Sequence, residues 1–332
     1  MRPDATPKSA HGEDRDQAQP GSGRNRALTR RASAIALVLA LVLIVARVWG
    51  WTVTGSMALL TSAADGLLDA LASLATFLGI RYAHRPADHD HRYGHGKAEA
   101  MAAFTQAVLL ATTGLVFGAQ SLWRLFFPEP LFAVGMGVVV AAGSLVTSVF
   151  LVAMQTWVLR RTRSTAIAAD RVHYLTDVVV NLGVLAALAV TWATGWVRAD
   201  PAFALAIAAY MLWNAGSIAR EASVQLLDRE LAAEQRKQIR AAALACPGAR
   251  AIHDIRTRNA GDRVFVEFHL EVDGDITVHE GHRIVDAAEQ AVRALFPEGS
   301  EVIAHVEPVG IVDERLDDRV GHAEQPTSKQ PT

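Results

Sequence analysis

Long stretches without Asp, Glu, Lys or Arg constrain this sequence more than any other feature. The longest, residues 130–159, contains 30 residues without a charged side chain. A helix that crosses the hydrocarbon layer of a membrane needs about 20 mostly apolar residues. Buried core helices of a soluble protein are the alternative, but a run of this length argues against them. Shorter uncharged runs occupy residues 32–46, 48–64, 100–123, 178–197 and 201–219.

The distribution of these runs predicts a polytopic α-helical membrane protein with a six-helix transmembrane domain over residues 31–222. The turns between the helices are short and contain polar residues, Gly or Pro. We expect the six helices at residues 31–52, 57–82, 99–126, 131–159, 168–194 and 201–222.

Composition narrows the functions that remain. The chain has 32 Lys and Arg against 34 Asp and Glu, a net charge of −2, which argues against a protein that binds nucleic acid through positive charge. The single cysteine, Cys246, excludes an intrachain disulfide framework and a Cys-rich zinc module. Any metal chemistry must therefore use carboxylates and the 12 histidines.

The positions of Lys and Arg indicate the orientation in the membrane. They are concentrated around residues 81–97 and 160–171 and before the first span, and such residues favour the cytoplasmic side. We therefore expect a multi-pass protein of the cell (inner) membrane with cytoplasmic N- and C-termini. A signal peptide is not expected, because a long polar segment precedes the first apolar run. We interpret residues 1–30 and 313–332 as disordered tails.

The remaining segment, residues 223–312, is predicted to form a soluble cytoplasmic domain. Residues 263–272 alternate between apolar and polar side chains, as a half-buried strand does. Thr277 can cap a helix with Glu280 three residues later. The order of elements is α-β-β-α-β, which suggests a small three-stranded sheet covered by two helices, of a ferredoxin-like or metallochaperone-like type. The elements are expected at residues 232–245, 250–258, 263–272, 277–296 and 301–309.

Four ionisable residues fall inside the predicted spans. Asp65 and Asp69 lie in the second span, and His173 and Asp177 lie in the fifth. Each pair has i, i+4 spacing and therefore occupies one face of its helix. A charged side chain at membrane depth costs about 2.5 kcal/mol or more on insertion scales and usually faces a cavity with a function. Polar contacts between helices, or positions near the lipid headgroups, are the alternative.

Together the four residues would supply one nitrogen and three oxygen ligands to a cation. This set suits tetrahedral Zn²⁺, and other divalent transition metals are compatible with it. The empty site would be strongly negative, so protons should replace the metal when it leaves. The residues thus offer a chemical basis for metal–proton exchange. We assign Asp170 and Arg171, which are also in this region, to the headgroup level.

Two more groups of possible metal ligands lie outside the spans. The loop at 86–97 contains several His and Asp residues, although a solvated acidic loop explains that pattern equally well. In the C-terminal domain, His305 and Glu307 are two residues apart on a strand and project to one face. His269 lies on the face of its strand away from the aliphatic row. The loop residues are Asp88, His89, Asp90, His91 and His95, and histidines recur in the domain at 253, 269, 279, 282 and 305.

Five motifs make the chain resemble the cation diffusion facilitator family, most closely the bacterial ferrous-iron/zinc efflux type. The resemblance covers residues 30–312 and implies a homodimer in the lipid bilayer that exports divalent transition metals in exchange for H⁺ by alternating access. Zn²⁺ is the expected ion, transported and also structural or regulatory, with Fe²⁺, Cd²⁺, Co²⁺ and Mn²⁺ as alternatives. The motifs are Ala63-Ala-Asp-Gly-Leu-Leu-Asp69, Tyr93-Gly-His-Gly-Lys-Ala-Glu99, His173-Tyr-Leu-Thr-Asp177, Leu226-Leu-Asp-Arg229 and His253-Asp-Ile-Arg-Thr-Arg258.

The resemblance also implies roles for particular residues. Asp65, Asp69, His173 and Asp177 match the transport site, and Lys97 and Asp228 match a charge interlock between the membrane and cytoplasmic parts. The family carries Asp where this chain has Glu307, as the bridging ligand of a binuclear site that stabilises the dimer. The other residues of that site are His253, His269, His282 and His305, and a separate loop site comprises Asp88, His91 and His95.

Three other functions are less consistent with the sequence. An ATP-driven pump lacks support, because no G-x-x-x-x-G-K-[ST] motif is present. His279-Glu280-Gly281-His282 resembles the H-E-x-x-H motif of zinc hydrolases, but the second histidine comes one residue early. A membrane-anchored metal sensor would not explain ionisable residues inside two spans. We therefore expect a transporter and not an enzyme.

Overall fold

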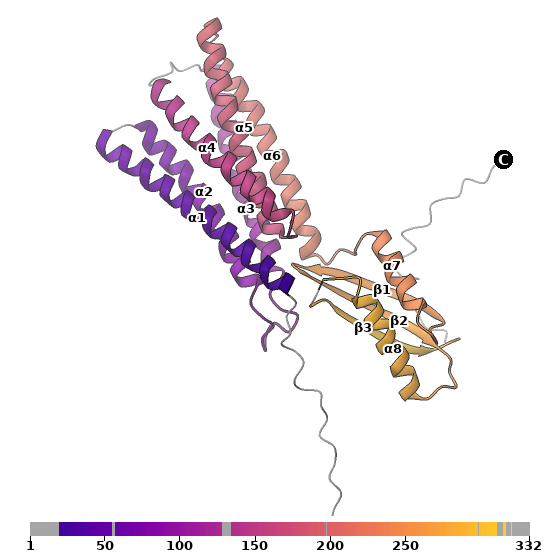
Figure 1. Cartoon of the computed structure of the whole chain (residues 1–332). Coiled ribbons are helices and arrows are strands. Elements are labelled where there is room, and N and C mark those ends of the chain that lie inside the picture. Colours follow the sequence, from indigo (N-terminus) through magenta and orange to yellow (C-terminus); the bar gives the residue numbers. More distant parts are fainter. Residues whose placement is uncertain are drawn as a thin grey trace, which may run out of the picture.

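The computed structural model describes residues 20–54, 57–127, 134–196, 198–297, 299–310, 315–316 and 320. Figure 1 shows long helices that run side by side as an elongated bundle, with a small α/β domain at one end. The bundle helices are α1 (Pro20–Thr54), α2 (Met57–Ala83), α3 (Ala98–Phe126), α4 (Val134–Leu159), α5 (Thr165–Thr194) and α6 (Ala199–Leu226).

The six-helix prediction is confirmed, since all six helices are long and apolar enough to cross a membrane. Many large apolar side chains on them are exposed, among them Val45, Leu115 and Trp213. Such an outer surface is expected when lipid and not water surrounds the bundle. The ends of the helices differ from the expected ones by a few residues, except at the N-terminus.

The first helix begins at Pro20, so the prediction of a disordered segment up to residue 30 is wrong for its last part. Proline suits the first position of a helix, where its missing N–H is not needed. Leu28, Thr29 and Ala32 then pack onto the bundle, and Arg26 Nε lies 2.9 Å from Asp262 Oδ2 of the C-terminal domain. Tertiary contacts thus keep a polar segment helical. Residues 1–19 and most of 313–332 lie outside the described residues.

Helices α3 and α6 approach each other closely through small residues. A Cβ atom at Gly114 would lie 3.2 Å from Met211 Cβ, and one at Gly118 would lie 3.3 Å from Ala208 Cβ. Small residues of this kind let helix backbones pack closely in membranes. The two helices therefore form a tight pair within the bundle.

The C-terminal domain contains α7 (Ala233–Leu244), β1 (Ala251–Ala260), β2 (Arg263–Val272), α8 (Val278–Arg293) and β3 (Glu301–Pro308). The strand order is β1-β2-β3, with β1 and β2 antiparallel and β2 and β3 parallel. The α-β-β-α-β prediction is confirmed. Apolar residues on alternate positions of β2, such as Val266 and Phe268, pack against Ile239 of α7 and Val292 of α8. The opposite face of the sheet is therefore left for polar side chains.

Close backbone contact joins the two parts of the molecule. Gly96, in the segment before α3, lies against Ala260 and Gly261 in the β1–β2 turn, and a Cβ on Gly96 would collide with the Ala260 backbone. A backbone atom cannot move aside as a flexible side chain can, so this approach requires glycine. Figure 1 shows the strands reaching the end of the bundle at this point.

Candidate metal centre

Two membrane helices bring three possible metal ligands together inside the bundle. His173 Nε2 on α5 lies 3.3 Å from Asp69 Oδ1 on α2 and 3.9 Å from Asp177 Oδ2 one turn further along α5. The i, i+4 spacing places His173 and Asp177 on one face of α5, as the sequence predicts. The fourth predicted residue, Asp65, belongs to α2, but its side chain lies outside the described residues.

The geometry of this cluster fits a small divalent cation. Ligand atoms around a tetrahedral ion with bonds of 2.0–2.2 Å lie about 3.4 Å apart, and one atom from each of the three residues lies within 4.8 Å of the others. Neither ring nitrogen of buried His173 has a hydrogen-bond partner among the described residues. Because a buried polar atom is costly when it lacks a partner, a bound cation would satisfy it.

Neighbouring contacts fix α5 against α2 beside the cluster. Tyr174 Oη and Ser73 Oγ are hydrogen-bonded at 2.7 Å, and both side chains are buried. Asn181 Nδ2 donates to the backbone carbonyl of Asp177 at 2.7 Å. The Tyr174–Ser73 bond thus joins the two ligand-bearing helices, whereas the Asn181 bond lies within α5.

Asp170, assigned above to the headgroup level, is buried between the helices of the bundle. Its side chain is 0% exposed and accepts hydrogen bonds from Gln106 Nε2 of α3 at 2.7 Å and from Gln155 Nε2 of α4 at 2.5 Å. The network therefore joins three helices one turn before His173. Gln106 and Gln155 lie in other helices than Asp170. The only sequence signal for this network is that both are polar residues within apolar runs.

A second cluster lies in the loop between α2 and α3. Asp88 Oδ1 lies 3.1 Å from His91 Nδ1, and Asp88 Oδ2 lies 3.2 Å from His95 Nε2. Asp88 Oδ1 also accepts hydrogen bonds from the backbone N–H groups of Asp90 and His91. The bond from the His91 backbone is the main reason why the pKa of the Asp88 carboxyl is lowered from its ordinary value of 3.8. His89 is exposed and lies beside Asp90, so among the described residues the structure brings together the three predicted loop ligands without His89.

The third cluster occupies the polar face of the C-terminal sheet. His253 of β1, His269 of β2 and His305 of β3 are register partners across the three strands. Glu307 Oε1 lies 2.7 Å from His269 Nδ1, and Glu307 Oε2 lies 3.2 Å from His253 Nε2. His253 Nδ1, His253 Nε2 and His269 Nδ1 are buried, and despite these short distances they are not aligned for a hydrogen bond with any of the described residues. Atoms of this kind fit a bound metal ion. The Glu307 carboxylate lies beside them, although its side chain is one methylene longer than that of Asp.

The other predicted ligands of this site lie further out. His305 meets His269 edge to face with ring centroids 5.1 Å apart, but its side chain is 68% exposed and its Nε2 is 3.8 Å from Glu307 Oε1. His282 lies on α8 beside Asp286 and is 72% exposed. Within the described part of the chain, His282 is therefore not a member of the cluster of His253, His269 and Glu307.

The sequence did not single out Glu271 as a first choice for this site. Glu271 pairs with Glu307 across β2 and β3, and its Oε1 lies 3.2 Å from His253 Nδ1 and accepts a hydrogen bond from Arg315 Nη2 at 2.8 Å. Its alternation with His269 along β2 could have indicated this position, because i, i+2 residues share a face.

The predicted charge interlock is present as a contact. Lys97 precedes α3, and its Nζ lies 2.9 Å from an oxygen of Asp228, which follows α6. Arg258 of β1 lies 3.6 Å from the same carboxylate and also stacks over the ring of Tyr93. The contact thus joins the membrane helices to the C-terminal domain.

Comparisons with known proteins agree with this architecture. Residues 33–227 match the cation efflux transmembrane domain, and residues 231–309 match the cytoplasmic domain of cation efflux proteins. The chain is 41% identical over 285 residues to the cation-efflux pump FieF of Klebsiella pneumoniae, which covers 86% of this chain and 94% of that protein. It is 40% identical to FieF of Cronobacter sakazakii with the same coverage. A solved structure of the Zn form of CzrB, described as a zinc transporter, is 41% identical and covers 26% of this chain and 99% of that chain, with a TM-score of 0.24.

These matches identify a transporter of metal cations and not an enzyme. The chain belongs to the cation efflux, or cation diffusion facilitator, family. It is accordingly a multi-pass membrane protein of divalent metal efflux, and the resemblance inferred from the five motifs is confirmed.

Proposed function

We propose that this protein exports Zn²⁺ from the cytoplasm in exchange for protons, by alternating access through a site made of Asp65, Asp69, His173 and Asp177. The observation that carries the proposal is the approach of Asp69, His173 and Asp177 from two membrane helices. Nitrogen and oxygen ligands suit Zn²⁺, while Fe²⁺, Cd²⁺, Co²⁺ and Mn²⁺ compete for the same donor set.

Proton coupling follows from the chemistry of the ligands. Histidine and carboxylates bind metal only when deprotonated, so protons and metal compete for the same atoms. Three carboxylates and one histidine leave an empty site strongly negative at membrane depth, where uncompensated charge is costly. Protons that enter from the opposite side of the membrane would neutralise the site on its return. The excess of Lys and Arg near residues 81–97 and 160–171 supports cytoplasmic termini in the cell (inner) membrane.

In the cytoplasmic domain, we propose that His253, His269 and Glu307 bind metal and that the occupied domain stabilises a homodimer. His305 is near enough to join them after a small movement. His282 requires a larger rearrangement or a second chain, because it is exposed on α8 and lies outside the cluster of the described residues. Asp88, His91 and His95 form a separate proposed loop site, and Lys97 and Asp228 are proposed to keep the two parts of the protein coupled.

Metal uptake into proteoliposomes tests the transport proposal. Wild-type protein should move Zn²⁺ in response to an imposed pH gradient and should move protons in the opposite direction. Asp177→Ala should abolish this flux yet elute as folded protein, and Asp275→Ala, which removes an exposed carboxylate, should transport normally. Wild-type flux in Asp177→Ala would refute the site, and flux that ignores the pH gradient would refute proton coupling. Competition by the other divalent ions in the same assay establishes the selectivity.

A further inference from the structure

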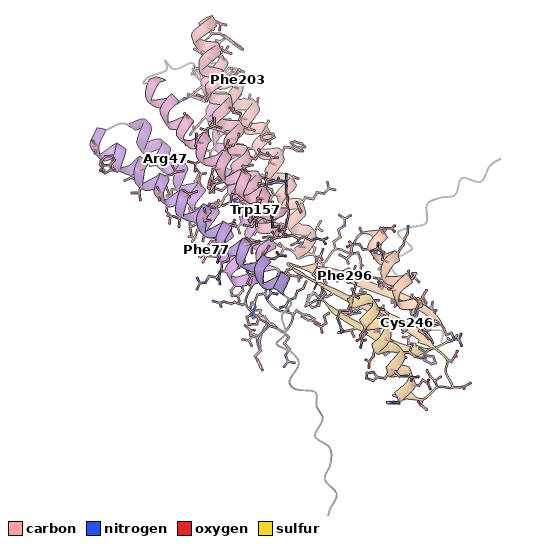
Figure 2. The ribbon with its side chains drawn as sticks, viewed as in Figure 1. Arg47, Phe77, Trp157, Phe203, Cys246 and Phe296 are labelled. Carbon is pink, nitrogen blue, oxygen red and sulfur yellow. The ribbon has the colours of Figure 1, made fainter. Side chains whose placement is uncertain are left out.

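Arg47 is a cationic residue inside a membrane-spanning helix. It lies in α1 within the apolar segment Asn25–Val53, between two uncharged runs of sequence, and Figure 2 labels it on that helix. An arginine at membrane depth is costly to bury and keeps its proton under all physiological conditions. Apolar neighbours cannot compensate the charge of this guanidinium, so its polar contacts on other helices are of interest.

The guanidinium of Arg47 reaches two other helices. Its Nη2 donates a hydrogen bond to Ser144 Oγ of α4 at 2.8 Å. Its Nη1 occupies the space beside Gly66 of α2, where a Cβ atom would collide with it. The group is therefore held between α1, α2 and α4, and the absence of a side chain at position 66 makes room for it.

This position is next to the proposed transport site. Gly66 follows Asp65 and precedes Asp69 by three residues, so it lies within about one turn of both on α2. Helix α2 runs from Met57 towards Ala83, and its Ala83 end leads into the loop that contacts the C-terminal domain. Gly66 therefore lies at the level of the proposed site, between Asp65 and Asp69 along α2, and the Arg47 guanidinium lies beside it.

A fixed positive charge at this position acts differently on the empty and the occupied site. It compensates the carboxylates when no metal is bound, and it repels a divalent cation when one is bound, because Coulomb interactions are strong at low dielectric. We propose that Arg47 is a tethered counter-ion that competes with the metal for the site carboxylates and so promotes metal release. This inference rests on the proposed transport function, and it assigns Arg47 a role in metal affinity and turnover.

Three variants of the full-length protein separate charge from packing. Arg47→Gln removes the charge and keeps a hydrogen-bond donor, Arg47→Lys keeps the charge, and Ser144→Ala removes the bond to α4 while leaving the charge. Zn²⁺ affinity is measured in detergent by competition with a fluorescent indicator. Each variant is also measured with Asp177→Ala, so that the difference reports the transport site alone. Initial transport rates are measured in proteoliposomes at saturating Zn²⁺.

Arg47→Gln should bind Zn²⁺ at the transport site about tenfold more tightly, a change equivalent to about 1.4 kcal/mol, and its maximal transport rate should fall. Arg47→Lys should keep a Zn²⁺ affinity and a maximal transport rate close to those of the wild type, and Ser144→Ala should keep the wild-type affinity. The inference is overturned if Arg47→Gln has wild-type affinity and rate, or if Ser144→Ala reproduces its effects. Wild-type transport by Asp177→Ala would instead refute the proposed function.

A second route is needed if Arg47→Gln does not fold. Gly66→Ala pushes the guanidinium away from α2 without removing its charge, so it should also tighten Zn²⁺ binding and slow the maximal rate. Gly66→Ala with unchanged affinity and rate would overturn the inference independently of Arg47→Gln.

Discussion

Lys97 Nζ donates a hydrogen bond to Asp228 Oδ2 at 2.9 Å, and the two residues are separated by the whole of α3 to α6. Asp228 adopts a left-handed backbone conformation with φ of +53°. Asn and Asp tolerate this conformation better than other residues that carry a Cβ atom. The chain therefore has two reasons to carry Asp at this position, one in the side chain and one in the backbone.

Substitutions of Asp228 should separate these two contributions. Asp228→Asn keeps the backbone preference and loses an exposed ion pair, which contributes about 0.2–1 kcal/mol. Asp228→Ala also loses the backbone preference, at a further cost of about 1–2 kcal/mol. Melting of the detergent-purified protein should therefore give the order wild type, Asp228→Asn, Asp228→Ala. Equal melting temperatures for the two variants would show that the backbone conformation contributes nothing.

The buried Asp170 network should be sensitive to the type of substitution. Asp170→Ala leaves the side-chain amides of Gln106 and Gln155 without their acceptor, at about 1–3 kcal/mol for each buried group. Asp170→Asn offers an acceptor to one glutamine and a donor to the other, since both glutamine Oε1 atoms lack a partner among the described residues. Asp170→Ala should melt well below Asp170→Asn. Similar melting temperatures for both would contradict a role for these hydrogen bonds.

Metal binding in the cytoplasmic domain should depend on Glu307. In an Asp177→Ala background, Glu307→Ala should weaken Zn²⁺ binding by about 10- to 100-fold, the loss expected even for residues that only orient a ligand. Glu307→Asp should retain binding, because it keeps the charge and both oxygens. Calorimetric titration of the full-length protein measures this, with exposed Glu267 of the same strand changed to Ala as the control. Equal binding in all of these proteins would exclude Glu307 as a ligand.

His84 should make the protein sensitive to mild acid. Burial is the main reason why the pKa of His84 is lowered from its ordinary value of 6.5, and Arg26 and Arg30 act in the same direction. The unfolded chain therefore binds this proton more readily than the folded protein, so the stability contribution is complete above pH 6.5 and decreases as the pH falls below it. His84→Gln should show a smaller loss of melting temperature than wild type between about pH 7.5 and about pH 5.5. An identical loss in both proteins would refute this assignment.

The sequence predicted those features that depend on local pattern. Uncharged runs placed the six helices because membrane crossing demands length and apolarity. Alternation along residues 263–272 predicted β2, and Thr277 caps α8 by accepting from the backbone N–H of Glu280, as expected. In each case the physical cause lies within a single element.

Features that depend on tertiary partners could not be predicted in the same way. Asp170 is buried because Gln106 and Gln155 reach it from other helices, and the sequence around Asp170 does not indicate these partners. The helical start at Pro20 depends on packing against α2, α3 and α4. The exposed position of His282 depends on which face of α8 covers the sheet. The shared register of His253, His269 and His305 required the strand pairing itself.

Because α3 and α6 pack closely at Gly114 and Gly118, we expect the two helices to tilt together as one rigid unit. Their ends at Lys97 and Asp228 are tied to the cytoplasmic domain, whereas the proposed ligands lie on α2 and α5. Helix α6 has 28 residues and is about 42 Å long at 1.5 Å per residue. A tilt of about 5° at the cytoplasmic end would therefore displace the far end by about 3.7 Å. That displacement exceeds a metal–ligand bond of about 2.1 Å, so a small rotation of the cytoplasmic domain would move the far end of α6 by more than the length of one coordination bond.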